Sequence, residues 1–141
     1  MSEKCFFCDI QKKEDKNRIG SSSKFFSRYC DFPVSNGHAL VFPKKHIPSV
    51  FEIPPKQLNE LFDLVKKTKE EIENEYGADG FNIGINEGKA AGQSIPHFHI
   101  HIIPRYKGDV DNPKGGIRNI FPDKADYTLE AKKDDNLKDY V

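Results

Sequence analysis

Three histidines alternate with apolar residues in one short segment of this 141-residue chain. The histidines are His97, His99 and His101, and the residues between and after them are Phe98, Ile100 and Ile102. Successive side chains of a β-strand point to opposite faces, so the pattern predicts a strand with three imidazoles on one face. Ordinary solvent-facing strand positions favour other residue types, because imidazole has only middling strand preference. The pattern therefore indicates that one face packs and the other carries chemistry.

Two kinds of chemistry use a row of histidines: metal binding, and nucleophilic or acid–base catalysis. At about 3.3 Å per residue, the Cα atoms of His97 and His101 would lie about 13 Å apart. Nitrogen ligands bind zinc at about 2 Å, so at most two of the three imidazoles can share one ion. We therefore expect at least one of them to act as a nucleophile or as an acid or base.

A glycine-rich segment, residues 84–94, directly precedes the histidines. Its glycines let backbone N–H groups approach an anion closely, and its polar side chains add neutral hydrogen-bond donors. These side chains belong to Asn86, Gln93 and Ser94. A glycine-rich turn alone is more often a simple connection between strands. Its position against the histidines favours a loop that binds a phosphate.

Residues 92–105 resemble the signature of the histidine-triad (HIT) family, in which three histidines alternate with apolar residues. Residues 37–46 and 81–86 are similar to two further segments of that family, and residues 5–8 to the cysteine pair of its zinc-containing branch. Residues 105–118 resemble an extension of its microbial members. The resemblance covers residues 5–122 in the family's order.

This resemblance implies an α+β fold, with an antiparallel sheet, one main helix packed on it, and assembly as a homodimer. It implies a nucleotide hydrolase or nucleotidyl transferase that attacks the α-phosphate of adenosine dinucleotides, nucleoside phosphoramidates or related nucleotidyl conjugates. His99 would form a covalent nucleotidyl-histidine and AMP would be released. His38 and His101 would orient its ring and steady the phosphoryl oxygens, with no catalytic cofactor. Neutral imidazole suits this role because it is both nucleophile and leaving group near pH 7.

The resemblance also implies contacts to the nucleotide from Asn86, Gln93 and Ser94. Many members carry an acidic residue or Asn eight positions before the histidine matched by His38, where it holds the ribose hydroxyls. Here that position is Cys30, followed by Asp31. Either the loop is one residue shorter and Asp31 contacts the ribose, or ribose recognition is weaker.

The cysteine pair Cys5-x-x-Cys8 has three interpretations in a reducing compartment: metal ligands, free thiols or a redox pair. The sequence shows no thioredoxin-like surroundings, which disfavours the redox pair. A structural zinc needs two further ligands, and the family comparison selects His46 and His97. We expect Cys30 to be a small buried residue.

Basic and acidic residues balance, with 22 Lys and Arg against 22 Asp and Glu. This favours a small-molecule ligand over nucleic acid. The amino terminus lacks the apolar region of a signal peptide and no apolar run would span a membrane, so we expect a cytoplasmic protein. Two alternative functions stay open: a nucleotide-binding regulatory module with little turnover, and a dinucleoside polyphosphate phosphorylase.

The periodicity predicts strands at residues 25–29, 39–42, 81–86 and 97–103, the last bracketed by Pro96 and Pro104. One amphipathic helix is expected between Leu58 and Tyr76, ending at Gly77. We place a single domain at residues 1–122 and a polar carboxy-terminal tail at residues 123–141.

Overall fold

The computed structural model describes residues 4–141 and divides the chain into two compact units, residues 1–106 and 107–141. Residues 1–3, part of the stretch that argued against a signal peptide, lie outside the described residues. The division falls before the boundary at residue 122 suggested by the sequence. The guanidinium of Arg118 donates hydrogen bonds to the carbonyls of Lys124 and Ala125, which groups residues before 122 with those after it. In the second unit the helix α3 spans Thr128–Ala131.

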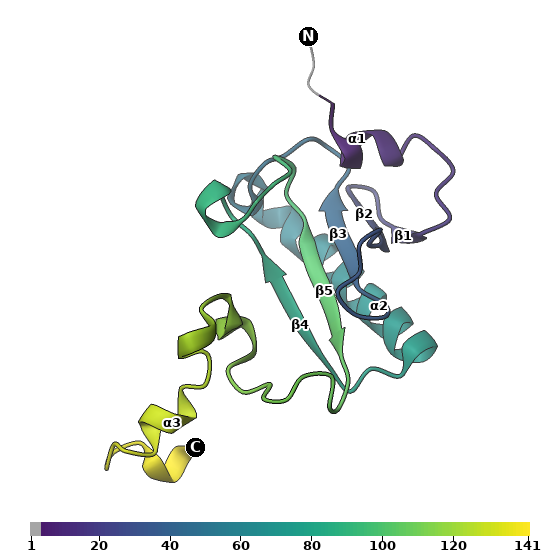
Figure 1. Ribbon diagram of the computed structural model, residues 1–141. Coiled ribbons are helices and arrows are strands. Elements are labelled where there is room, and N and C mark those ends of the chain that lie inside the picture. Colours follow the sequence, from purple (N-terminus) through teal and green to yellow (C-terminus); the bar gives the residue numbers. More distant parts are fainter. Residues whose placement is uncertain (1–3) are drawn as a thin grey trace. The chain divides into compact units, whose positions relative to one another are not determined.

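Five strands form one antiparallel sheet in the order β1-β2-β3-β5-β4 (Figure 1). Their bounds are Arg18–Ser21 for β1, Phe25–Tyr29 for β2, Ala39–Pro43 for β3, Gly80–Ile85 for β4 and Ile100–Arg105 for β5. The helices of this unit are α1 at Phe6–Ile10 and α2 at Leu58–Tyr76. The expected antiparallel sheet with one main helix is confirmed. We did not expect α1, which covers only about one and a half helical turns, or β1, whose sequence Arg18–Ser21 has a single apolar side chain, Ile19.

Helix α2 packs its apolar stripe on one face of the sheet. Pro55 lies in the short helical turn that leads into it, and Gly77 ends it with a left-handed φ of 68°. The core on this face contains Leu61, Leu64, Val65 and Ile72 from α2, and Phe25, Val41, Phe98, Ile100 and Ile102 from the sheet side. Each such side chain contributes about 1.5–3 kcal/mol on burial. No helix within residues 4–141 is long and apolar enough to cross a membrane.

The opposite face of the sheet has its own apolar cluster, which α1 partly covers. It consists of Cys5, Phe7, Phe26, Leu40 and Phe42. The ring of Phe7 stacks on that of Phe42 with 4.4 Å between centroids. This packing brings the amino-terminal segment onto the face opposite α2.

One strand prediction was wrong at its start, because β5 begins at Ile100 and not at residue 97. The backbone N–H of His97 bonds to the carbonyl of Ile95, and that of Phe98 bonds to the carbonyl of Ile47. These loop partners replace a neighbouring strand, and Pro43 at the end of β3 has no N–H to offer. The side chains of residues 98, 100 and 102 nevertheless share the core face, as predicted. The strand also continues through Pro104.

Candidate functional site

The triad histidines meet where β3 and β5 pair. His38 immediately precedes β3, His99 immediately precedes β5, and His101 lies within β5 opposite Leu40. The Nε2 atom of His38 lies 3.0 Å from Nδ1 of His101. The rings of His99 and His101 are 5.0 Å apart between centroids. The fold therefore brings together all three histidines that the family resemblance selected for catalysis.

Hydrogen-bond partners assign the tautomers of these three rings. The N–H of Val34 donates to Nδ1 of His38 at 3.2 Å, so the proton of His38 is on Nε2 and is donated to Nδ1 of His101. The remaining proton of neutral His101 is then on Nε2. Nδ1 of His99 lies 2.9 Å from the carbonyl of His97 and donates to it, which leaves Nε2 of His99 as a free lone pair. One ring thus offers a nucleophile and its neighbour an N–H donor.

Burial keeps the triad neutral at pH 7. Desolvation is the main cause that lowers the pKa of His38 and His99 below the usual value. For His101, burial and then the neighbouring His99 and His38 lower the pKa to about 4. A neutral imidazole is the form that can attack an electrophile.

The loop that carries His38 is fixed by its surroundings. Ser35 donates its hydroxyl to the carbonyl of Pro104 at 2.7 Å, and the hydroxyl of Tyr106 donates to the carbonyl of Asn36 at 2.6 Å. Gly37 has φ 94°, and a Cβ there would lie 2.9 Å from the ring of Tyr76. Only glycine meets both constraints, so Gly37 lets the chain turn against α2 and present His38.

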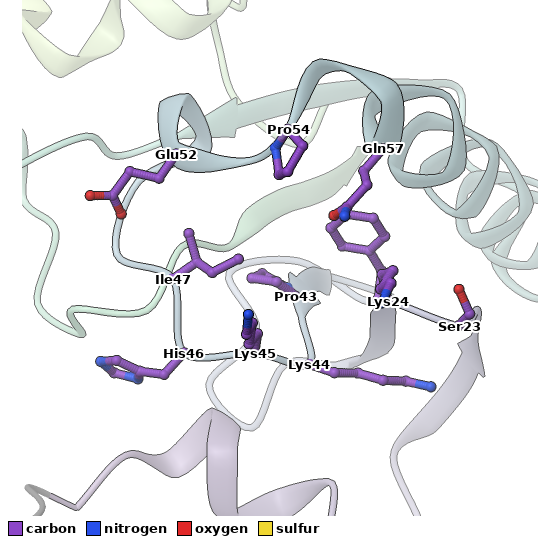
Figure 2. Close-up of a pocket in the computed structure, with 11 residues that line it drawn as sticks. Ser23, Lys24, Pro43, Lys44, Lys45, His46, Ile47, Glu52, Pro54 and Gln57 are labelled. Carbon is purple, nitrogen blue, oxygen red and sulfur yellow. The ribbon is translucent and has the colours of Figure 1, made fainter.

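A second group of side chains lies beside the triad: Cys5, Cys8, His46 and His97, whose ligand atoms all lie within 4.8 Å of one another. The cysteines flank the start of α1, and His46 lies on the segment that follows β3 (Figure 2). The Nδ1 atoms of His46 and His97 are 3.3 Å apart. The distances from sulfur to Nδ1 are 3.4 Å for Cys5 to His97 and 3.5 Å for Cys8 to His46.

These separations match a tetrahedral site. Zinc bonds of about 2.0 Å to nitrogen and 2.3 Å to sulfur place two nitrogens about 3.3 Å apart, and a nitrogen and a sulfur about 3.5 Å apart. The Nε2–H of His97 donates a hydrogen bond to the carbonyl of Pro43 at 2.7 Å, which leaves Nδ1 unprotonated as the ligand atom. The cluster can therefore hold a metal ion.

Phe7 contributes to both groups, and the sequence interpretation missed it. Its ring centroid lies 4.9 Å from that of His99 and 5.5 Å from that of His97. It is 2% exposed and stacks on Phe42. The only sequence signal was an apolar residue between two cysteines.

The polar residues of the glycine-rich segment have different environments. Gln93 accepts from the N–H of Gly88 and donates to the carbonyls of Pro48 and Ile95, so its amide organises the loop. Ser94 is exposed. Asn86 is also exposed and follows β4 two residues after Gly84, which pairs with His101. By strand alternation Asn86 lies on the histidine face.

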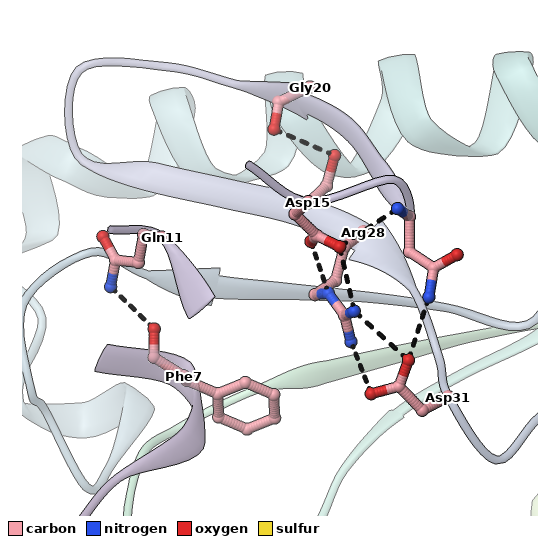
Figure 3. Close-up of polar contacts among 8 residues, drawn as sticks. Phe7, Gln11, Asp15, Gly20, Arg28 and Asp31 are labelled. Atoms are coloured by element: carbon pink, nitrogen blue, oxygen red, sulfur yellow. Dashed lines mark hydrogen bonds and ion pairs between the residues drawn. The ribbon is translucent and has the colours of Figure 1, made fainter. Parts of the chain in front are cut away.

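Asp31 takes part in an ion-pair network (Figure 3). Arg28 is 2% exposed and donates to both Asp15 and Asp31. Asn17 also donates to Asp31, at 2.9 Å. These residues line a cavity of about 510 Å³. Any ligand that uses Asp31 must share its carboxylate with Arg28 and Asn17.

Comparisons with known proteins agree with this geometry. The family model of the HIT domain matches residues 11–108. The chain is 38% identical over 123 residues to an uncharacterized HIT-like protein of Methanocaldococcus jannaschii, covering 86% of this chain and 95% of that protein. It is 36% identical over 100 residues to a bis(5'-adenosyl)-triphosphatase of Dictyostelium discoideum, covering 67% of each. A zinc-bound histidine triad family protein from Mycobacterium smegmatis superimposes with a TM-score of 0.67 at 34% identity, covering 74% of this chain and 77% of that one. The chain belongs to the HIT, or histidine-triad, family.

Proposed function

We propose that this protein is a nucleotide hydrolase or nucleotidyl transferase that attacks the α-phosphate of an adenosine dinucleotide or related nucleotidyl conjugate. The observation that carries the proposal is the free Nε2 lone pair of His99 beside the N–H of His101. The substrate class is supported by the 36%-identical relative that is named a bis(5'-adenosyl)-triphosphatase.

The reaction has two steps. Nε2 of His99 forms a bond to the α-phosphorus, and the bond from phosphorus to the leaving-group oxygen breaks, with the electron pair going to that oxygen. Water then attacks the same phosphorus and releases His99 and AMP. In the intermediate the ring carries positive charge, which the carbonyl of His97 stabilises through the proton on Nδ1. The Nε2–H of His101 donates to a non-bridging phosphoryl oxygen, and His38 holds that ring in place.

Asn86, Gln93 and Ser94 act on the other side of the phosphate. Ser94 and Asn86 supply exposed donors, and Gln93 holds the loop that presents them. Asp31 contacts the ribose while it remains paired with Arg28.

The Cys5, Cys8, His46 and His97 cluster binds a structural Zn²⁺. Four protein ligands fill a tetrahedral zinc site, so no position remains for water or substrate. The support is the donor geometry, together with the 34%-identical neighbour that is zinc-bound.

Two copies of the chain associate through β4. This strand lies at one edge of the sheet, and its Ile83 and Ile85 are 42% and 40% exposed. An apolar edge strand offers both unpaired backbone groups and hydrophobic area to a second copy.

The test is product and protein mass analysis after mixing the enzyme with diadenosine triphosphate. We expect AMP and ADP as products, and an alkaline quench should trap an adenylyl adduct on His99. His99→Ala should show neither. AMP binding without turnover would favour a regulatory module. Conversion of the adenylyl group to labelled ADP in the presence of labelled phosphate would favour a phosphorylase.

A further inference from the structure

A cavity of about 710 Å³ opens between the end of β3 and the segment that leads into α2 (Figure 2). One wall is formed by residues 43–47 and the other by Glu52, Pro54 and Gln57. Ser23 and Lys24 close one end. None of the triad histidines lines this cavity, so the reaction proposed above does not account for it.

The cavity is basic. Lys24, Lys44 and Lys45 line it against one carboxylate, that of Glu52. None of these lysines forms an ion pair within residues 4–141. The chain as a whole is neutral, with 22 basic and 22 acidic side chains, so this is a local excess of positive charge. Such an excess attracts anions.

The carboxylate of Glu60 lies near Lys24 and keeps its negative charge, so the three lysines exceed the two local carboxylates, Glu52 and Glu60, by one charge. The Glu60 carboxylate accepts from the hydroxyls of Ser22 and Ser23, at 2.6 and 3.0 Å, and from the backbone N–H of Lys24 at 2.8 Å. The N–H of Lys44 in turn donates to the carbonyl of Lys24 at 2.8 Å. These bonds fix the backbones from which two of the lysines project, so the site is partly preorganised.

The interior of the cavity is apolar. Phe25 and Pro43 are buried there, and Ile47 and Pro54 complete the lining. Charges interact more strongly beside such a low-dielectric surface than in bulk water. The ammonium group of lysine binds phosphate as a compact positive charge. Three lysines therefore suit a ligand that carries several phosphate charges.

We propose that this cavity is a second ligand site for an oligophosphate, either inorganic or the phosphate chain of a nucleotide. The site is separate from the triad and does not depend on the proposed reaction. Lys24 from one segment and Lys44 and Lys45 from another hold the phosphates between them.

The first test is lysine acylation followed by peptide mass spectrometry, with the triad pocket saturated by AMP. Tripolyphosphate should slow acylation of Lys24, Lys44 and Lys45 while leaving Lys66 and Lys67, on the exposed surface of α2, unaffected. If nucleotides use the site, ATP should protect the same three lysines. If they do not, only tripolyphosphate should protect them. Uniform protection of all lysines, or protection that AMP abolishes, would overturn the proposal.

The second test is calorimetric titration of tripolyphosphate in the presence of AMP. The pair Lys44→Gln and Lys45→Gln should weaken binding by at least about tenfold, whereas the matched pair Lys66→Gln and Lys67→Gln should change it by less than about twofold. Lys24→Gln, remote in sequence from the metal cluster, should also weaken binding. Zinc content and melting temperature serve as folding controls. Equal affinity in all variants would refute the site.

Discussion

Removal of the proposed zinc should lower the melting temperature by an amount that follows from linkage. An ion that binds only the folded chain, at a free concentration 100 times its Kd, stabilises it by about 2.7 kcal/mol. Unfolding entropy of about 2.1 cal/mol/K per residue gives about 0.3 kcal/mol/K for 141 residues. The zinc-loaded protein should therefore melt about 9 °C above the zinc-free protein under these conditions.

The perturbation is the double variant Cys5→Ser with Cys8→Ser, compared with the wild type in zinc and in chelator. Loss of both sulfur ligands should make the melting temperature insensitive to zinc. Cys30→Ser is the matched control, because Cys30 lies outside the cluster. The chelated wild type lacks only the metal, whereas the double variant also lacks the buried Cys5 thiol. The difference between their melting temperatures therefore measures the effect of the side-chain change alone.

The assay combines calorimetry with elemental analysis of protein purified without a histidine tag. One zinc per wild-type chain and none in the double variant is the expected result. Activity at low temperature should fall much less in this variant than in His99→Ala. Less than about a tenth of an equivalent of zinc, with unchanged melting in the double variant, would refute the reasoning.

Three further results are expected. His99→Ala should abolish turnover while AMP affinity stays within about tenfold, because the change removes the bond-forming atom but few ground-state contacts; normal activity would exclude the covalent step. Loss of the Gln93 and Ser94 side chains together should lower kcat by about 10²-fold or more. An unchanged kcat would show that the glycine-rich segment only connects two strands. Hydrogen bonds from Arg28 hold the pKa of Asp15 below its usual value, so this stabilisation is fully present above about pH 4 and is lost as pH falls through the lowered pKa. Asp15→Asn should lower the melting temperature at pH 7, and the difference from wild type should shrink in acid; a difference that grows there would contradict the assignment.

Local patterns in the sequence were sufficient for the elements with long or regular periodicity. The apolar alternation of Phe98, Ile100 and Ile102 correctly predicted a shared core face, and the helical period correctly predicted α2. The start of β5 was not predictable in this way. It depends on the carbonyl of Ile47, remote in sequence, which accepts the hydrogen bond of Phe98 N–H. It also depends on Pro43, which has no N–H to continue the pairing of β3 with β5.

The chemistry of the site depends on backbone conformations and contacts that the residue types alone do not specify. The tautomer of His38 is determined by the N–H of Val34, and that of His99 by a carbonyl two residues earlier. The amide of Gln93 is directed by the carbonyl of Pro48, which lies 45 residues away in the sequence. The sequence could identify the side chains, but their proton positions follow only from the folded backbone.

His97, the first histidine of the row, has different partners from the other two. Its Nδ1 faces the cysteines and His46, its Nε2–H donates to the carbonyl of Pro43, and its own carbonyl accepts a hydrogen bond from Nδ1–H of His99. In the proposed mechanism, a metal ligand at this position would fix the orientation of the nucleophile through the main chain, and its ring would take no part in the reaction. Alternate spacing would thus allow one short segment to serve the proposed metal site and the proposed nucleophile through different nitrogens.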